Sequence, residues 1–341
     1  MATRKTTIHD IALKLNLTAS TVSRALNNHP KISTSTKELV RNTAEAMNYK
    51  PNTLAASLRT GIAKTIGLVV PRINRDFISN TIYGIEQVTK EAGYNLIIFQ
   101  SDESLERELL GLKTLVNSRV DGILISISRE TNVSHHLENL LKDGIPLVQF
   151  DRVREDVNTS KVVNDNMGAA FEAVSHLINQ GCRRIVHFSG PNDINIYNER
   201  QKGYCKALTD NKIKIEKELL FEGVITREKG FEIAKELFSS SKLPDALFAD
   251  SDYSALGALL VARELKLRVP EQLKIVGFAN EPFTEFITPT ITTLDQKAQE
   301  IGAEAAKLLI NEIENKGKKL NRKKIIIKPS LLIRQSSQNN L

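Results

Sequence analysis

Apolar residues recur at helical spacing near the start of the chain. The first such stretch predicts a helix over 8–15, because its apolar positions fall on one helical face. Thr7 and, three residues later, Asp10 form the pattern of a capping box at its start. Asn16 follows the stretch and tolerates the left-handed conformation that a tight turn needs. We therefore expect a short helix that ends in a tight turn.

Two more helices are expected in the same segment. Thr18 is a suitable N-cap for a helix over 19–27, whose inward positions are apolar and whose outward face is short, polar and cationic. A third helix is predicted to begin near 33–36, with an apolar stripe formed by Leu39, Val40, Ala44 and Met47. Three short helices around one small core are typical of a helix-turn-helix module, although protein-interaction modules also use this packing.

Beyond residue 61 the pattern changes to short apolar runs that alternate with amphipathic stretches. Strands are expected at 65–70, 94–100, 122–126, 146–150, 184–189, 246–249 and 273–278. Helices are expected at 78–92, 105–118, 133–142, 168–180, 197–210, 226–239 and 254–266. This alternation predicts an α/β body of doubly wound parallel sheets in two similar lobes, with a ligand cleft at the carboxyl ends of the strands.

The chain is thus expected to have three parts: a small all-α head at 1–50, a segment with little apolar bulk at 51–62, and the body at 63–341. Crossings between the lobes are expected near Asn164, Asp295 and Lys323. They divide the body into an N-lobe at about 63–163 and 293–323 and a C-lobe at about 164–292 and 324–341.

Charge separates the head from the body. The chain of 341 residues has a formal net charge of +7, and residues 1–61 hold nine Lys or Arg against three Asp or Glu. The remaining residues hold 38 basic and 37 acidic side chains, so their net charge is only +1. A local positive field of this kind attracts a polyanion such as DNA, unless the segment is merely a solvated tail.

Several function classes are disfavoured. Cys182 and Cys205 are the only cysteines, too few for a disulfide framework, and neither an export signal nor a membrane-spanning apolar run is recognisable, so a cytoplasmic location is expected. We find no glycine-rich phosphate loop and no nucleophile motif. His135 and His136 are adjacent on a predicted surface helix and point in different directions, which favours a solvated face over a metal site. No catalytic residue, metal or cofactor is expected.

The motifs of the head resemble those of the lactose and purine repressor family of bacterial transcriptional regulators. Residues 7–12 (TIHDIA), 18–27 (TASTVSRALN) and 48–52 (NYKPN) match the family's helix-turn-helix head almost position for position. The body resembles the family's periplasmic-binding-protein-like effector domain over nearly its whole length, with motifs at 120–123 (VDGI), 268–270 (RVP) and 289–293 (PTITT).

The resemblance implies roles in DNA binding. The base-reading positions are Ala19, Ser20 and Arg24, of which Arg24 is the best chemical reader because an arginine fork bonds a guanine bidentately. The positions of phosphate contacts are Thr7, Thr18, Thr21, Ser23 and Asn27. The segment at 51–62 corresponds to the family's hinge helix, with Leu58 and Arg59 in the minor groove, although a plain linker is the alternative.

The resemblance also implies an effector site in the cleft, formed by Asn74, Asp76, Phe77, Asp151, Arg152, Arg200, Phe248, Asp252 and Asn280. This polar lining suits a sugar or a similar hydroxylated metabolite. Ala279 departs from the pattern, since many relatives have an aspartate there, and a strong acceptor for a neutral sugar is missing. Ile194 and Ile196 replace polar ligands and disfavour a purine.

The expected function is a sequence-specific DNA-binding transcriptional regulator. We expect a repressor that works as a homodimer on a pseudo-palindromic operator and is controlled by a sugar-like effector. Induction and co-repression both fit the sequence. A stand-alone sugar-binding protein would need an export signal, and a sugar-processing enzyme would need an acid-base or nucleophile constellation, so the head favours the regulator over both.

Overall fold

The computed structural model describes residues 6–49, 62–318 and 321–338. The chain divides into two compact units, the head up to Ala63 and the body from Lys64 onward. The predicted hinge residues Leu58 and Arg59 lie outside the described residues.

The helices of the head are α1 (Ile8–Leu15), α2 (Ala19–Leu26) and α3 (Thr34–Ala46). Thr7 and Asp10 form the expected capping box at the start of α1, and Asn16 ends this helix with φ at 54°, in the left-handed region. The Thr18 hydroxyl accepts a hydrogen bond from the backbone N–H of Thr21 and caps α2. Side chains that sequence alone identifies as caps therefore set the bounds and the turn of this helix pair.

The core of the head contains Ile11, Val22 and Val40, all fully buried. The expectation that Leu39 belongs to this core was wrong, because its side chain is 52% exposed. Successive residues on a helix point about 100° apart, so the stripe that begins at Val40 leaves the preceding residue at its edge.

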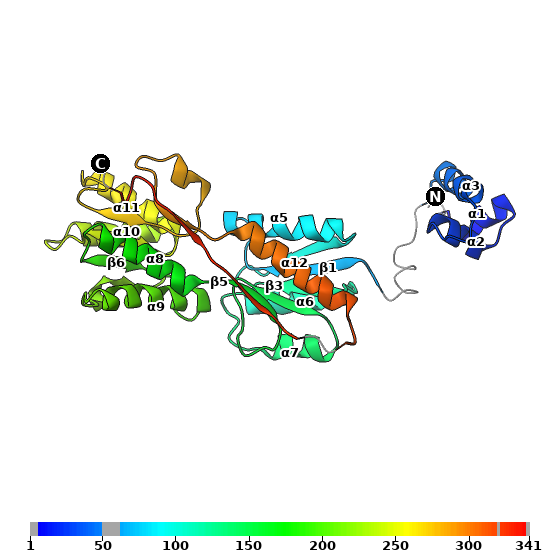
Figure 1. The fold of residues 1–341 in the computed structure, drawn as a ribbon, viewed down its shortest axis with the longest axis horizontal. Helices are drawn as coiled ribbons and strands as arrows, with labels where there is room; N and C mark the ends of the chain where they lie inside the picture. The colour runs from blue at the N-terminus through cyan, green and yellow to red at the C-terminus, as the bar shows by residue number, and fades with distance from the viewer. Residues whose placement is uncertain (1–5, 50–61, 319–320, 339–341) are drawn as a thin grey trace. The chain divides into compact units, whose positions relative to one another are not determined.

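The N-lobe of the body is a six-stranded parallel sheet with helices on both faces (Figure 1). Its strands are β1 (Thr65–Val70), β2 (Asn95–Gln100), β3 (Gly122–Ile125), β4 (Leu147–Phe150), β5 (Ser160–Asn164) and β11 (Lys324–Ile327), in the order β11-β5-β4-β3-β1-β2. Its helices are α5 (Asp76–Glu91), α6 (Leu105–Asn117), α7 (His135–Lys142) and α12 (Ala298–Glu314). All four residues of β3 and of β4 are buried, as expected for the middle of a parallel sheet covered on both faces.

The C-lobe repeats the architecture with a four-stranded parallel sheet in the order β7-β6-β8-β9. Its strands are β6 (Ile185–Phe188), β7 (Leu220–Phe221), β8 (Ala246–Ala249) and β9 (Lys274–Val276), and its helices are α8 (Asn166–Asn179), α9 (Asn195–Asp210), α10 (Arg227–Phe238) and α11 (Asp252–Glu264). Two short 3-10 turns are at Lys217–Leu219 and Pro282–Glu285, and the antiparallel pair β10 (Thr293–Asp295) and β12 (Ser330–Leu332) adjoins this lobe. The two lobes confirm the expected α/β class with doubly wound parallel sheets.

The chain passes between the lobes at three points of the described structure. The first crossing follows β5 and the second joins β10 to α12, both as expected. The third was expected near Lys323 but follows Ile327, because β11 pairs with β5 in the N-lobe sheet. An isoleucine-rich run fits the edge of either sheet, so its pattern does not tell which lobe it joins.

The N-lobe wall of the cleft depends on close packing of α12 against α5. A Cβ atom at Gly84 would come within 2.1 Å of the Gln299 carbonyl oxygen, and one at Gly302 within 2.1 Å of the Thr81 carbonyl oxygen. Only glycine permits this approach of two backbones. Since α12 begins at the second crossing, this contact fixes the crossing against the start of α5.

Candidate functional site

The outward face of α2 is the first candidate surface. Val22 and Ala25 point into the core of the head, whereas Ser20 and Arg24 are exposed. Within the described residues the Arg24 side chain makes no hydrogen bond or ion pair, so its donors face solvent. Ala19 is half-buried and packs partly against the core. The predicted base-reading residues thus include Ala19 and Ser20 in the first turn of α2 and Arg24 in its last turn, and Ser20 and Arg24 are exposed and polar.

The predicted phosphate-contacting residues lie around the ends of α1 and α2. Thr7 and Thr18 are the N-caps of these helices, where backbone N–H groups and the helix dipole favour an anion. Thr21 and Ser23 are partly exposed in α2, and the Asn27 side chain donates to the Ser23 carbonyl oxygen at 2.8 Å. These assignments stay predictions, but the positions suit contacts with a phosphate backbone.

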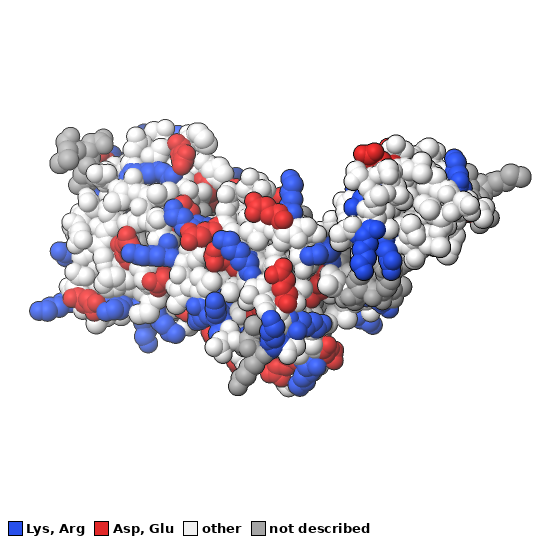
Figure 2. Space-filling view, turned by 45° about the vertical axis from the view of Figure 1, so that its right-hand side comes forward, with Lys and Arg blue, Asp and Glu red and all other residues white. Residues whose placement is uncertain are grey.

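The charge distribution on the surface agrees with the sequence count. On the face drawn in Figure 2, the body carries blue and red side chains intermixed, whereas the head carries blue side chains with red only near its upper edge. Exposed cations of the head include Lys14, Arg24, Lys31 and Arg41. The head therefore presents a predominantly positive surface to a polyanion.

A cavity of about 250 Å³ between the lobes of the body is the second candidate site. Its lining residues follow the carboxyl ends of N-lobe and C-lobe strands, where open α/β sheets bind ligands. Of the predicted effector-binding residues, four line this cavity: Phe77, Asp151, Arg152 and Arg200.

Arg200 is the most deeply held polar group of the cavity, with a residue exposure of 3%. Its guanidinium donates to Asn166 Oδ1 at 2.9 Å, to the Asp250 carbonyl oxygen at 3.0 Å and to Gln296 Oε1 at 3.3 Å. It also lies 3.5 Å from the centroid of the Phe278 ring. Burial lowers the pKa of Arg200, although nearby acidic groups oppose this shift. The group is thus a fixed cation whose remaining donor capacity faces the cavity.

Asp151 and Arg152 lie side by side after β4. Arg152 Nη1 donates to Glu103 Oε2 at 2.6 Å, and the Ser126 hydroxyl donates to Asp151 Oδ2 at 3.2 Å. Asp151 has φ at 59°, which turns the chain sharply at the end of the strand. Burial raises the pKa of Asp151, and the cations Arg152 and Arg200 oppose this shift. The N-lobe wall therefore offers both an acceptor and a paired cation.

Sequence reasoning missed a contact that bridges the two lobes. The Arg75 guanidinium, just before α5 in the N-lobe, lies 4.8 Å from the centroid of the Tyr253 ring in the C-lobe. The Tyr253 hydroxyl donates to Glu281 Oε2 at 3.4 Å. All three side chains line the cavity. Arg75 and Tyr253 each follow the carboxyl end of a strand, β1 or β8, and this position was the available signal.

The other predicted effector-binding residues lie outside this cavity. Asp76 and Asn280 line an adjoining cavity of about 420 Å³, and Phe77 lines both. Asn74 is exposed and lines neither. Phe248 is fully buried in β8 and stacks on His187, with ring centroids 5.1 Å apart. These residues do not converge on one volume.

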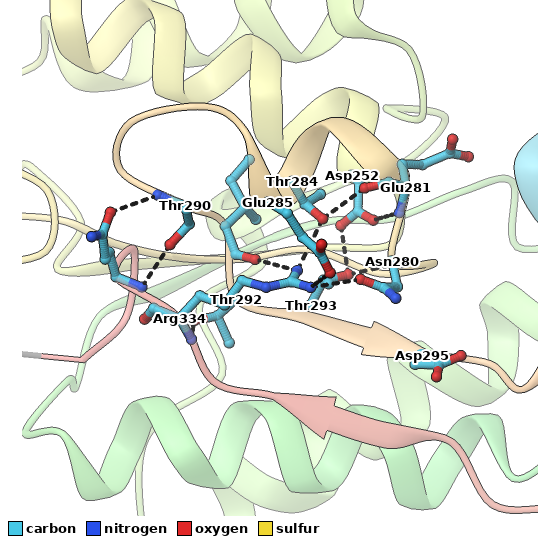
Figure 3. A network of polar contacts seen from close by, with 12 residues as sticks. Asp252, Asn280, Glu281, Thr284, Glu285, Thr290, Thr292, Thr293, Asp295 and Arg334 are labelled. Atoms are coloured by element: carbon cyan, nitrogen blue, oxygen red, sulfur yellow. Dashed lines mark hydrogen bonds and ion pairs between the residues drawn. The ribbon is translucent and has the colours of Figure 1, made fainter.

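Asp252 and Asn280 belong to a polar network that supports the C-lobe wall (Figure 3). Asp252 is fully buried and accepts hydrogen bonds from the Thr293 hydroxyl at 2.7 Å and from the backbone N–H of Glu281 at 2.8 Å. Arg334, which follows β12, donates to Asn280 Oδ1 at 2.9 Å. The C-terminal segment thereby holds the loop that carries Ala279 and Glu281 into the cavity.

Ala279 has an unusual backbone conformation, with φ at 118°. An L residue is strained there, and its backbone N–H donates to the Leu294 carbonyl oxygen at 3.0 Å. Ala279 lines both cavities. The strained residue therefore lies in the cleft wall, where it sets the path of the loop beside both cavities.

Burial shifts the pKa of two carboxylates at this wall, Asp252 behind it and Glu281 in the cavity lining. Burial raises the pKa of Asp252 to about 6, with hydrogen bonds from Glu281 N–H and Thr293 opposing the shift. Burial, with the nearby carboxylates of Asp252 and Asp76, raises the pKa of Glu281 to about 7. The protonated and ionised forms of Glu281 are therefore about equally populated in the folded state near neutral pH.

The described residues contain no group of three or more His, Cys, Asp or Glu side chains arranged to hold a metal ion. The expectation of a solvated His135–His136 face was partly wrong, because His136 Nε2 lies 2.9 Å from Oε1 of the buried Glu108. The carboxylate of Glu108 also accepts from Ser128 N–H, so Glu108 ties α6 both to α7, through His136, and to the β3–α7 loop, through Ser128. Within 6–49, 62–318 and 321–338, no helix has the length and apolar character needed to cross a membrane.

Comparison with known proteins gives matches to both units. Residues 7–52 match the family described as bacterial regulatory proteins, lacI family, and residues 174–337 match the periplasmic binding protein-like domain. The HTH-type transcriptional repressor CytR of Escherichia coli (strain K12) is 33% identical over 308 residues, which cover 90% of this chain and 90% of CytR.

Two solved structures resemble the chain over nearly its whole length. The transcriptional regulator CelR, in a complex with cellobiose, is 28% identical with a TM-score of 0.73 and covers 97% of this chain and 100% of its own. The lac repressor dimer bound to operator and the anti-inducer ONPF has a TM-score of 0.88 at 21% identity and covers 98% of this chain and 100% of its own. At 21% identity, the likeness to the lac repressor shows a shared fold alone.

The raised pKa of Glu281 predicts a pH-dependent stability. Its reference pKa is 4.5 and its folded pKa about 7, so ionisation weakens the folded state progressively as pH rises through that interval. Glu281→Gln removes this penalty and should stabilise the body near pH 8 by about 1–2 kcal/mol, since solvent screening reduces the full effect, with no gain near pH 5. Thermal unfolding at several pH values measures the effect. Glu264→Gln, at an exposed position in α11, is the control, and an unchanged pH dependence in Glu281→Gln would contradict the account.

Proposed function

The chain belongs to the lacI family of bacterial regulatory proteins, and on this premise we propose that it is a repressor whose operator affinity is controlled by a sugar or sugar derivative. It is a DNA-binding transcription regulator and not an enzyme, like the family to which it belongs. The observation that carries the proposal is the exposed, polar and cationic face of α2 on a head that holds most of the chain's excess positive charge.

In the proposed complex, α2 enters the major groove with its outward residues at base edges. Arg24 reads a guanine bidentately, while Ser20 and Ala19 contact neighbouring bases. The capped N-termini of α1 and α2 bind phosphates through backbone N–H groups and through the hydroxyls of Thr7 and Thr18. Leu58 and Arg59 are proposed to enter the minor groove. Because the DNA lies there, the protein acts in the bacterial cytoplasm.

The cleft is proposed to bind the effector. Arg200, Asp151 and Arg152 supply fixed donors and acceptors, and Tyr197, Tyr253 and Phe278 supply aromatic faces. This combination suits a ring that bears hydroxyl groups, which needs apolar stacking together with convergent polar contacts. The likeness to CelR, whose structure holds cellobiose, supports a carbohydrate-type effector. Asp76, Asn280 and the adjoining cavity extend the site toward the second crossing.

We propose a homodimer as the working form. β2 is the edge strand of the N-lobe sheet, and it exposes Ile97 and Ile98 beside exposed Leu110 of α6. In the C-lobe, Phe286 is 82% exposed. Apolar surface on an unpaired strand edge favours coverage by a second copy. Two heads related by a two-fold axis would then read a pseudo-palindrome.

Effector binding is proposed to act by changing how the lobes close on each other. The Arg75–Tyr253 contact joins the two walls of the cavity, so a ligand between the walls competes with it or reinforces it. A change at the N-lobe alters the spacing of the two hinge segments across the dimer axis and so alters DNA affinity. Thermodynamic linkage requires that operator DNA changes effector affinity by the same factor.

Arg24→Ala tests the DNA-reading role. The variant should lose about 1–3 kcal/mol of discrimination at the guanine that Arg24 reads, while weak salt-dependent binding to any duplex remains. Quantitative footprinting on operator and random competitor measures the ratio. Lys14→Ala removes the same charge from an exposed position of α1 and should leave this ratio intact. Equal specificity in Arg24→Ala and in the wild type would refute the assignment.

Arg200→Ala tests the effector site. A panel of sugars, sugar phosphates and nucleosides is screened by thermal shift on the wild-type chain, and each hit is titrated into the variant. Loss of a charged hydrogen-bond donor should weaken binding by about tenfold or more. Arg200→Lys keeps the buried charge and should show an intermediate loss, which separates binding from folding. Arg227→Ala, on the exposed start of α10, is the control, and undiminished binding in both Arg200 variants would locate the site elsewhere.

A further inference from the structure

Three arginines follow three neighbouring strands of the N-lobe sheet. Arg72 follows β1, Arg129 follows β3 and Arg152 follows β4. These strands are adjacent and parallel in the order β4-β3-β1, so their carboxyl ends meet at one edge of the sheet. All three side chains line the first cavity, and Arg75 and Arg200 bring the number of arginines in its lining to five.

The carboxylates that line the same cavity already have partners within the protein. The pairs are Glu103 with Arg152, Asp151 with Ser126, Asp250 with His187, and Glu281 with Tyr253. Burial raises the pKa of Asp151. Burial, with neighbouring carboxylates, raises the pKa of Glu281 to about 7, so this carboxylate is only partly ionised near neutrality. Because five arginines line the cavity against four carboxylates, and only Glu103 among these is hydrogen-bonded to an arginine side chain, cationic capacity remains in the lining.

That capacity lies in Arg72 and Arg129. Arg72 Nε is 3.9 Å from Asp102 Oδ1, and both side chains of this loose pair are about half exposed, so the contact is weak. Arg129 donates its backbone N–H to Glu103 Oε2 at 3.1 Å, but among the described residues its guanidinium has no hydrogen bond or ion pair. Two guanidinium groups with open donors therefore face one cavity from the N-lobe.

The opposite side of the cavity has a different character. The C-lobe contributes Ile194, Ile196, Ile225 and Ala279, and its cation Arg200 already donates to three oxygen atoms. The other polar groups of this side, Asp250, Ser251 and Glu281, have partners within the protein, so open cationic donors face a ligand from the N-lobe side. A guanidinium fork matches the geometry of a phosphate or carboxylate and binds it more strongly than a neutral hydroxyl.

We propose that the effector carries an anionic group, a phosphate or a carboxylate, which Arg72 and Arg129 bind at the N-lobe side of the cavity. The inference rests on the proposed effector role of this cavity and specifies its ligand class. A neutral sugar would offer both guanidinium groups only hydroxyl oxygens, which are weaker acceptors, whereas a sugar phosphate or sugar acid would offer them a charged oxygen group.

Hydrogen–deuterium exchange on the full chain tests the proposal, with inorganic phosphate and malonate as probes at constant ionic strength. Both anions should slow exchange in the segments at 71–78 and 126–131 with saturable dependence on concentration. Because the readout is local, anions that bind the head do not contribute to it. The probe that binds more tightly distinguishes a phosphate-bearing from a carboxylate-bearing effector.

The decisive variant is Arg72→Gln/Arg129→Gln. Both side chains are exposed, so the fold should be retained, and the anion affinity at these segments should fall by about tenfold or more. Arg263→Gln/Arg268→Gln removes the same charge from exposed positions of the C-lobe outside the cavity lining and should keep wild-type affinity.

Two outcomes would overturn the proposal: wild-type anion affinity in Arg72→Gln/Arg129→Gln, or absence of slowed exchange in the wild type. If a neutral sugar bound the body, lost affinity with Arg200→Ala and kept it with Arg72→Gln/Arg129→Gln, the anionic class would be wrong while the effector role of the cavity would stand.

Discussion

One buried cation connects the C-lobe sheet to the first and second crossings between the lobes. Arg200, on α9, donates to Asn166 at the start of α8, to the backbone at the end of β8, and to Gln296 at the second crossing. Taking a guanidinium out of water is costly unless every donor is satisfied, so these oxygen atoms are held in place around it. The same group faces the cavity. A ligand that competes for its donors therefore acts on the first and second crossings and on the C-lobe sheet at once.

The division of charge assigns a different task to each unit. The head combines a cationic surface with two capped helix N-termini, which suits a phosphate backbone, while the nearly neutral body keeps its uncommitted arginines inside a cleft. The head therefore binds a large polyanion by its surface, and the cleft selects a small molecule by enclosure. The strained backbone at Ala279 and the Arg334 network set the path of the loop in the cleft wall.

Local signals in the sequence predict the head nearly to the residue, because side-chain caps such as Thr7 and Thr18 define helix ends within a few positions. The strand and helix alternation likewise predicts both lobes. Long-range contacts were harder to predict from the sequence. The edge pairing of β11 with β5 joins segments about 160 residues apart, and the Glu108–His136 pair involves a helix whose sequence is polar. Family correspondence named Arg200, which lines the cavity, but also named Phe248 and Asp252, whose side chains are buried behind the wall. A position after a strand end indicates the neighbourhood of a cleft, whereas packing decides which side chain enters it, as Arg75 and Tyr253 illustrate.

The central claim is that the outward face of α2 reads nucleobases when two copies of the chain meet a symmetric site. Selection from a pool of random duplexes by the purified full-length protein at moderate ionic strength, with and without metabolites, tests it most directly. The account predicts enrichment of duplexes that share an inverted repeat, because each head reads one half-site. Recovery of a pool no different from the starting mixture under every condition would contradict it.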